Sequence, residues 1–314
     1  MRTWPRLDII VPCHPTSLGD WAHLRRFLQS LKNQDYPHEA LRLYLITKGN
    51  SEEAKAYGIQ AGQGQLIGMF CADNVLLKPD DLRLLAQASK DCDGSYTCRY
   101  AYVPTDTALS RYFALLGAND PLCWWVGKAD RLSYLSRAVR TELLQFNATH
   151  HLPSLGDNGF LFHRRLLQGL DLTPARFGSC MDLCHDLVRL HGELRLRRVG
   201  TISIWHRTGE SLPTYFQKRW RYVNALYFDR LATRRWNMVC TPRDWVGVVT
   251  FTVASVLVLP HLLVSVLGAL RRWDPAWFLH PVICGVLTLS YACGLMRHLL
   301  KSVWSFVVST GKRN

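Results

Sequence analysis

The stretch "LIGMFCADNVLLKPDDL", residues 66–82, carries the clearest fold signal in this sequence of 314 residues. Its first five residues are an apolar run of strand length, and Cys71-Ala72-Asp73-Asn74 follows directly. Pro79-Asp80-Asp81 then places a proline and two acids where a helix begins. An acid just past a buried strand is either a turn former or a ligand for a metal and a phosphate. The local sequence leaves both interpretations of Asp73 open.

The segments around this stretch alternate between strand and helix patterns. We expect strands at residues 8–12, 41–46 and 65–70, and helices at residues 20–32, 52–62 and from 78 onward. This alternation predicts an α/β fold with a mostly parallel central sheet covered by helices on both faces. Ligands bind at the carboxyl ends of the strands in such sheets, and Asp73 lies at one of these ends.

The charge balance predicts anionic partners. Lys and Arg total 38 against 24 Asp and Glu, which gives a formal net charge of +14. Nucleic acid, lipid headgroups and phosphorylated substrates all fit this charge, but no RNA-recognition, zinc-finger or helix-turn-helix signature is present, so nucleic acid is not expected. The ten cysteines lack zinc-site spacing, and the N-terminus lacks a secretory signal. We therefore interpret them as reduced, mostly buried thiols.

Two apolar stretches near the C-terminus predict an integral membrane protein. Residues 245–270 and 277–296 contain no acid, Lys or Arg, and each exceeds or matches the roughly 20 residues needed to cross a bilayer. Trp at their ends favours two transmembrane helices over buried core helices, and Pro260 is expected to kink the first. The basic residues that flank the stretches place both chain ends and the polar part of the chain in the cytoplasm.

Residues 213–243 precede the first apolar stretch and hold seven Lys or Arg and one acid. Phe216, Trp220, Val223 and Tyr227 recur at helical spacing. This pattern predicts a basic amphipathic helix that lies on anionic lipid, with an ordinary core-packing helix as the alternative. The expected division of the chain is a catalytic domain at 1–212, this interfacial segment at 213–243, two transmembrane helices within 244–301 and a cytoplasmic tail at 302–314.

Six segments in order resemble the catalytic domain of glycosyltransferase family 2, the GT-A fold of inverting sugar transferases. They are "DIIVPCH" (8–14), "SLKNQDYP" (30–37), "EEAKAYGIQAGQGQLIGMFCADN" (52–74), "GDNGFLFHRRLL" (156–167), "CMDLCHDLVRLHG" (180–192) and "TISIWH" (201–206). The resemblance covers roughly residues 6 to 222. Together with two C-terminal spans, it is similar to the polyprenyl-phosphate sugar transferases of that family.

The resemblance implies a metal and donor site. Asp73 matches the second acid of the family's Asp-x-Asp motif, which binds Mg²⁺ or Mn²⁺ across the two phosphates of a nucleotide-diphosphate sugar. Cys71 stands where the motif has its first acid, and a thiol is a poor ligand for a hard cation. His206, at the end of a β-branched run, is the second expected metal ligand and would compensate. The expected donor-binding residues are Pro12, His14, Lys55, Asp73 and Asn74.

The resemblance also implies an acceptor side and a base. The expected acceptor-binding residues are Asp157, Asn158, Gly159, Gln217, Arg219 and Trp220, the last three from "QKRW", one residue shorter than the family's Gln-x-x-Arg-Trp. Asp182 is the expected catalytic base because the family places this acid at the start of a helix. Two alternatives remain open: Ser179 and Asp182 as a helix-capping box, and Asp186 as the base.

The expected function is a membrane-anchored, metal-dependent glycosyltransferase. It would move a sugar with inversion from a nucleotide-diphosphate sugar to a lipid-linked or polyprenyl-phosphate acceptor at a surface of anionic membrane lipids. A transferase of sugar-phosphate or polyol-phosphate groups has the same metal needs. Cys71 and the shortened "QKRW" leave open a non-catalytic relative that binds a nucleotide, lipid or membrane partner. Residues 111–131 are either an acceptor-binding insertion or a packing element.

Overall fold

The computed structural model describes residues 4–15, 17–136, 139–147, 152–155, 158–208 and 211–311. Within these ranges a mixed sheet of eight strands runs in the order β2-β1-β3-β7-β5-β8-β4, and β6 pairs with β8. The strands are β1 Leu7–Pro12, β2 Leu41–Ile46, β3 Leu66–Met69, β4 Asn74–Leu76, β5 Gly94–Tyr100, β6 Glu142–Asn147, β7 Phe160–His163 and β8 Glu193–His206.

The expectation of a mostly parallel sheet is wrong. β1 pairs with β2 and β3 in parallel, and β5 with β8. The pairs β3–β7, β5–β7, β4–β8 and β6–β8 are antiparallel. The chain has only four residues between β3 and β4, which is too short for the crossover that a parallel neighbour needs. β4 therefore does not pair with β3. It pairs with β8, which is distant in the sequence, and Asp73 lies in the turn between β3 and β4.

The helices and shorter turns connect and cover the strands. They are α1 Leu18–Lys32, α2 Ser51–Ala61, α3 Asp81–Ala88, α4 Ala108–Leu116, α5 Pro121–Trp125, α6 Pro174–Phe177, α7 Cys180–His191, α8 Leu212–Tyr222, a π-helical turn Val223–Phe228, α9 Pro242–Leu257, α10 Leu259–Arg272 and α11 His280–Gly311. Single 3₁₀ turns occupy His38–Ala40, Arg164–Leu167 and Pro275–Leu279.

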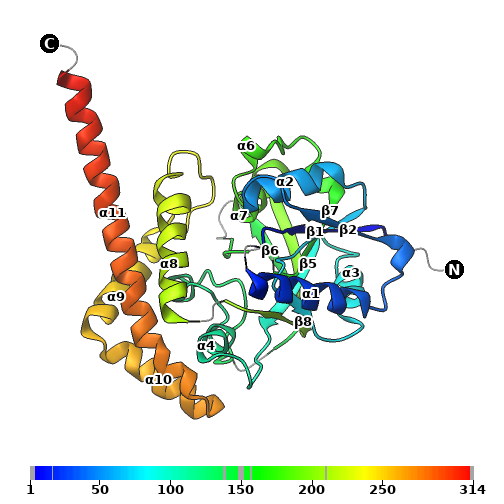
Figure 1. Cartoon of the computed structure of the whole chain (residues 1–314), viewed down its shortest axis with the longest axis horizontal. Coiled ribbons are helices and arrows are strands. Elements are labelled where there is room, and N and C mark those ends of the chain that lie inside the picture. The colour runs from blue at the N-terminus through cyan, green and yellow to red at the C-terminus, as the bar shows by residue number, and fades with distance from the viewer. Residues whose placement is uncertain are drawn as a thin grey trace.

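Two buried clusters of apolar side chains fill the two faces of the sheet. Side chains of a strand alternate between faces, so Ile9 packs with Phe27 of α1 and Leu82 of α3, whereas Ile10 packs with residues of α2 and α7 such as Ile59. Figure 1 shows α1 and α3 on one side of the sheet and α2, α6 and α7 on the other. The expected helices on both faces are therefore present, and the carboxyl ends of β1 and β3 meet at one edge.

The C-terminal helices differ from the two straight spans that we expected. In the described part of the chain, one helical stretch, Pro275–Trp304, is long and apolar enough to cross a membrane. The other predicted span is broken into α9 and α10, which are bent by 92° at Val258. Pro260 cannot continue the hydrogen bonds of a helix, and Val258 adopts φ 62°, a backbone conformation that β-branched residues avoid. The break is thus much sharper than the expected kink.

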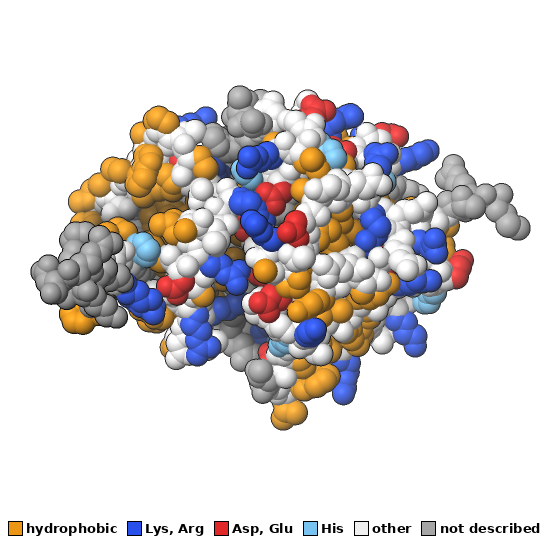
Figure 2. Space-filling view, turned by 90° about the horizontal axis from the view of Figure 1, so that it is seen from above, with side chains coloured by type: hydrophobic (Ala, Val, Ile, Leu, Met, Phe, Trp, Pro, Cys, Tyr) orange, Lys and Arg blue, Asp and Glu red, His pale blue; other side chains and the backbone are white. Residues whose placement is uncertain are grey.

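Buried polar contacts fasten these helices to the rest of the molecule. The ammonium of Lys128 lies 2.9 Å from the carboxylate of Asp244, and both side chains are at most 4% exposed. Asp274 accepts hydrogen bonds from Arg111 at 2.9 Å and from the hydroxyl of Tyr102 at 2.6 Å. The opposite faces of α9, α10 and α11 carry exposed apolar residues, among them Val249, Val256, Leu263, Leu267, Leu295 and Leu299. Figure 2 shows hydrophobic side chains gathered at that end of the molecule.

The aromatic stripe of residues 216–227 does not form one lipid-facing surface. Phe216 is 41% exposed, but Val223 is fully buried. Tyr227 lies edge-on to Tyr291 of α11, with ring centroids 5.7 Å apart. The helix also changes from α to π at Val223, which breaks the spacing of the stripe. For Val223 and Tyr227 the structure thus shows the core-packing alternative.

Candidate active site

The two residues expected to bind a metal lie side by side at one edge of the sheet. Antiparallel pairing sets Asn74, the first residue of β4, opposite His206, the last residue of β8. Asp73 precedes Asn74 in the turn, and its Oδ1 atom lies 3.1 Å from Nδ1 of His206. The side chain of His206 is 8% exposed and that of Asp73 is 24% exposed, so solvent reaches the carboxylate.

Electrostatics keep the Asp73 carboxylate ionised. Burial alone would raise the pKa of Asp73, but the neighbouring His206 imidazole and Lys218 ammonium outweigh it and hold this pKa below its ordinary value. Lys218 belongs to α8, which brings a positive charge toward the turn from a distant part of the chain. The site therefore combines an anionic ligand, an imidazole and a nearby cation.

Asn74 orients the turn that carries Asp73, and its side-chain oxygen is not free to bind a metal. Its Oδ1 accepts a hydrogen bond from the backbone N–H of Cys71 at 2.9 Å, so its amide nitrogen faces Asn158 Oδ1 at 2.9 Å and His206 Nδ1 at 3.3 Å. Asn74 is fully buried. The amide fixes the turn that carries Asp73, and it joins the expected donor side to Asn158 on the expected acceptor side.

A chain of buried hydrogen bonds continues from Asn158. Its amide nitrogen donates to the hydroxyl of Tyr100 at 2.9 Å, and this hydroxyl donates to Oδ2 of Asp130 at 2.7 Å. The ring of Tyr100 lies 5.6 Å from that of His206, centroid to centroid. Sequence reasoning left Asp130 undecided and did not find Tyr100. A tyrosine at the end of a strand was the available signal, but only the fold brings it to Asp130.

Asp130 is a buried carboxyl group of this network, and its pKa is raised. Burial raises its pKa, and the Arg131 guanidinium, the Tyr100 hydroxyl and the charge of His206 offset this only in part. Arg131 is itself buried and donates from Nε to Thr97 at 2.9 Å and from its terminal nitrogen to the backbone oxygen of Asn158. A buried carboxyl group with a raised pKa beside a fixed guanidinium is a candidate proton acceptor.

The other residues expected on the donor side occupy the same edge with different roles. Pro12 ends β1, whose parallel pairing with β3 sets it at the edge that holds residues 71–73, and His14 is exposed just beyond. Lys55 is only 2% exposed, and its ammonium pairs with Glu52 at 2.8 Å. A phosphate that reached Lys55 would share its ammonium, which has three N–H donors, with Glu52.

The residues expected on the acceptor side are divided. Asp157 lies outside the described residues. Gly159 has φ +73°, and a Cβ atom there would lie 2.9 Å from the side chain of Thr97, so the position requires glycine. Gln217 is exposed and Trp220 is half-buried on α8.

Arg219 of "QKRW" ties α8 to the turn before α5. Its guanidinium donates to the backbone oxygen of Asn119 and lies 3.5 Å from Asp120 Oδ2, and the side chain is about one-tenth exposed. Asp120 also accepts from the hydroxyl of Tyr291 of α11 at 2.6 Å. The amide of Asn119 reaches the Tyr100 hydroxyl at 3.4 Å. Arg219 and the last helix thus support the network rather than face open solvent.

Asp182, the expected base, is buried at the start of α7 and its oxygens are occupied. Oδ1 accepts from the backbone N–H groups of Arg235 and Trp236, both at 2.8 Å, and Oδ2 accepts from the Ser179 hydroxyl at 2.9 Å. Ser179 caps the helix by accepting from the Asp182 N–H at 3.2 Å. Asp186 accepts from Arg235 Nε at 2.8 Å. Both acids therefore hold the chain that leads to α9.

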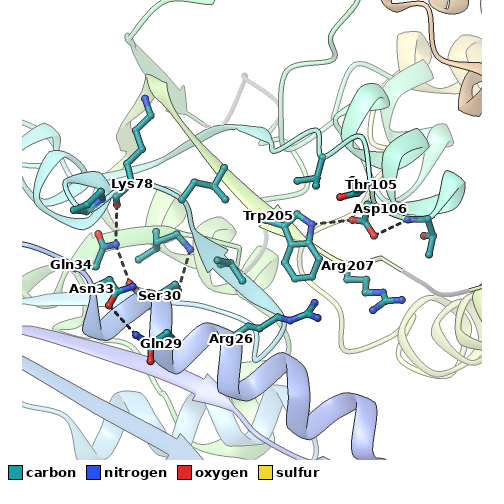
Figure 3. A pocket seen from close by; sticks show the side chains of 16 residues that line it. Arg26, Gln29, Ser30, Asn33, Gln34, Lys78, Thr105, Asp106, Trp205 and Arg207 are labelled. Atoms are coloured by element: carbon teal, nitrogen blue, oxygen red, sulfur yellow. Dashed lines mark hydrogen bonds between the residues drawn. The ribbon is translucent and has the colours of Figure 1, made fainter.

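A cavity in the described part of the chain lies on the other face of the β4–β8 pair. It measures about 720 Å³ and is lined by α1, β4 and the loop before α4, with Arg26, Lys78, Trp205 and Arg207 on its walls. Side chains alternate along β8, so Trp205 and Arg207 face this cavity while His206 faces the polar network. Figure 3 shows Trp205 held by its hydrogen bond to Asp106.

Comparisons with known proteins give matches to solved structures at low sequence identity. No family model matches the sequence, and no curated protein matches it. Among solved structures, a mannosyltransferase from Pyrobaculum calidifontis with GDP-Man and Mn²⁺ is 11% identical over 92% of this chain and 88% of that one, with a TM-score of 0.46. S. aureus TarS with UDP-GlcNAc is 10% identical over 91% and 90%, with a TM-score of 0.41. GalNAc-T7 with UDP, GalNAc and Mn²⁺ is 14% identical over 76% and 53%, with a TM-score of 0.41. The function proposed below is therefore based on the residues of this chain.

Proposed function

We propose that the protein is a metal-dependent glycosyltransferase that uses a nucleotide-diphosphate sugar. The observation that carries the proposal is the Asp73–His206 pair at the carboxyl edge of the sheet, 3.1 Å apart and next to Lys218. A nucleoside diphosphate that leaves from a sugar develops negative charge, and a divalent cation on such ligands neutralises it. The six segments that resemble family 2 agree with this reaction class.

The residues present fit a divalent cation. Two ligand atoms at right angles, each about 2.1 Å from a metal, are about 3 Å apart, which is close to the Asp73–His206 distance. The imidazole favours Mn²⁺ over Mg²⁺, because Mg²⁺ prefers oxygen ligands. With Cys71 in place of an acid, only one carboxylate of the motif remains. Phosphate oxygens of the donor would then complete the coordination, so cation and donor should bind cooperatively.

The catalytic base has two candidates. Asp182 is the base that the family resemblance implies, but its lone pairs are committed to Ser179, Arg235 and Trp236. Among the described residues, the Asp130 carboxylate accepts one short side-chain hydrogen bond, from Tyr100, and a longer one of 3.5 Å from Arg131. Its raised pKa brings it closer to the value at which a general base works best. We therefore place Asp130 ahead of Asp182 as the group that receives the proton of the acceptor hydroxyl in an inverting transfer.

The acceptor that best fits this arrangement is lipid-linked. The network that holds Asn158 and Asp130 continues through Asn119 and Asp120 to Tyr291 of α11, the helix apolar enough to cross a membrane. A site fastened to such a helix is held near lipid headgroups, where a polyprenyl phosphate or a lipid-linked saccharide is available. The positive charge of the chain suits both the donor and anionic lipids, on the cytoplasmic face where nucleotide sugars are present.

The test uses the purified full-length chain in detergent with Mn²⁺ and a panel of nucleotide sugars. Wild type should release nucleoside diphosphate, and Asp73→Asn should abolish this release and weaken Mn²⁺ binding measured by electron paramagnetic resonance. Asp171→Asn, at an exposed aspartate, is the matched control and should leave both unchanged. Near-normal turnover of Asp73→Asn would refute the metal assignment. Donor binding by wild type without turnover of any donor would support a non-catalytic binding protein instead.

A further inference from the structure

Two histidines and a cysteine meet in the interior of the C-terminal helices. His261 lies on α10, and His280 and Cys284 lie one turn apart on α11, so their side chains share a face. All three are fully buried. They belong to the helices far from Asp73 in the sequence, and neither the family resemblance nor the proposed reaction uses them. The meeting of three such side chains in the interior of these helices needs a separate explanation.

The spacing of their ligand atoms matches that of a metal centre. Nδ1 of His261 lies 3.2 Å from Nε2 of His280, and Sγ of Cys284 lies 3.7 Å from the same Nε2. The three ligand atoms all lie within 4.8 Å of one another. Around a tetrahedral zinc ion, with bonds of about 2.0 Å to nitrogen and 2.3 Å to sulfur, the corresponding separations are about 3.3 and 3.5 Å. The ligand atoms of His261 and Cys284 would move closer together on binding, and the three side chains would fill three positions around the cation.

The outer nitrogens of both imidazoles have partners of the kind that metal ligands need. Nε2 of His261 lies 3.0 Å from the hydroxyl of Ser255, and Nδ1 of His280 lies 2.7 Å from the hydroxyl of Tyr112 on α4. A histidine bound to metal through one nitrogen usually donates from the other to an oxygen, which fixes its tautomer and orientation. Both histidines can therefore turn an unprotonated nitrogen toward one point.

A hydrogen-bond chain from Ser255 through both histidines to Tyr112 explains the two imidazoles but not the thiol. Cys284 lies 3.7 Å from each nitrogen of His280, a distance that adds little as a hydrogen bond. As a metal ligand the same sulfur is at a suitable distance. The rings of Trp125 and Phe251 lie 5.2 and 5.5 Å from that of His261 and enclose the cluster with apolar surface.

We propose that His261, His280 and Cys284 bind one thiophilic d¹⁰ cation, Zn²⁺ or Cu⁺. Nitrogen and thiolate ligands select such cations over Mg²⁺ or Mn²⁺, so this centre and the Asp73–His206 site would hold different metals. On binding, the Cys284 thiol releases its proton to solvent. One thiolate leaves a net charge of +1 with Zn²⁺ and zero with Cu⁺, and the neutral complex is easier to bury. The cation would fasten α10 to α11 beside the sharp bend at Val258.

The experiment uses the full-length chain in detergent with Cys240 and Cys293, the two exposed cysteines, changed to serine. The protein is stripped with chelator, incubated with Zn²⁺ alone or with Cu⁺ under reductant, and washed, and retained metal is measured by mass spectrometry. One equivalent of either cation should remain, and that cation should raise the thermal midpoint. Co²⁺ in its place should give a thiolate charge-transfer band in the near ultraviolet.

Cys284→Ser is the deciding variant because it keeps the size of the side chain and removes the soft ligand. It should lose the charge-transfer band and at least tenfold in affinity, while its thermal midpoint without metal stays close to that of the stripped parent. Retention of Zn²⁺ identifies zinc as the cation, and retention of Cu⁺ alone identifies copper. The proposal is overturned if the parent retains neither cation, or if Cys284→Ser retains as much metal as the parent. Neither result depends on glycosyltransferase activity.

Discussion

The contacts of Asp182 predict that its loss affects stability more than chemistry. Asp182 is 3% exposed and accepts from two backbone N–H groups, those of Arg235 and Trp236. Asp182→Ala leaves both donors without a partner, at about 1–3 kcal/mol each, so we expect a loss of about 2–6 kcal/mol. Asp182→Asn keeps an oxygen for them but loses the charge, and we expect a loss of about 1–2 kcal/mol.

The assay is the thermal midpoint of the purified chain in detergent, measured by intrinsic fluorescence beside donor turnover. At about 2 °C for each kcal/mol, as for large domains, Asp182→Ala should melt about 4–12 °C earlier and Asp182→Asn about 2–4 °C earlier. Asp186→Asn is the matched control on the same helix. Its carboxylate is 23% exposed and pairs with a partly exposed Arg235, so it should cost less than about 1 kcal/mol.

Turnover decides between the two roles of Asp182. If the residue holds the chain in place, Asp182→Asn at a temperature well below its midpoint should keep turnover within a few-fold of wild type. A base substitution instead lowers turnover by about a hundredfold or more. Unchanged melting of Asp182→Asn together with such a loss of turnover would refute the structural role and restore Asp182 as the base.

Two further predictions follow from buried charges. Burial raises the pKa of Asp130, so the folded state binds the proton of this carboxyl group more tightly than the unfolded chain does. Protonation of Asp130 therefore stabilises the fold in full below about pH 4, and this stabilisation declines as the pH rises through the raised pKa. The thermal midpoint of Asp130→Asn relative to that of wild type should therefore increase with pH. The turnover of this variant should fall about a hundredfold or more if Asp130 is the base. A difference in midpoint that does not change with pH would contradict the raised pKa of Asp130. Lys128→Met leaves Asp244 buried without its cation, which should cost about 3–5 kcal/mol in the same melting assay, and the double variant with Asp244→Asn should recover part of this loss.

The elements of the N-terminal half could be predicted from local pattern. The expected strand at 41–46 matches β2, and the expected helix at 52–62 is within one residue of α2. In these segments the capping residues and the apolar spacing agree with the final fold, as in the capping box of Asn50 and Glu53. The antiparallel part of the sheet was missed because it joins strands that are far apart in sequence, such as β4 and β8.

The C-terminal region shows the limit of hydropathy as a guide. A run without charges identifies apolar helices, but it does not show whether both sides of a helix face lipid. Asp244 and Asp274 flank the apolar runs and form buried pairs with Lys128 and Arg111 of the preceding domain. Each of those pairs joins residues that are far apart in the sequence, so a local hydropathy pattern cannot predict it. The break at Val258 likewise needed the backbone conformation, since Pro260 alone predicted a kink.

For the candidate site, the order of motifs in the sequence identified the residues at the ends of strands. It did not identify the buried residues that are joined to them by hydrogen bonds. Asp73 and His206 were named from sequence and lie together, because both end or follow strands whose pairing is part of the fold. Tyr100 ends β5, and Asp130 and Arg131 follow α5; neither segment carries a motif. Their role became visible only when hydrogen bonds joined them to Asn158.

The contact between Tyr291 and Asp120 has a consequence for how the protein is made. The two residues are separated by 171 positions, so a chain emerging from the ribosome presents Asp120 long before its partner exists. Arg219, which lies beside the same carboxylate, also precedes α11. The sheet and the residues that end its strands can form first, but the support beneath Asn119 is completed only by the last helix. Completion of the candidate site is thereby coupled to the folding of α11, the last helix, onto the rest of the chain.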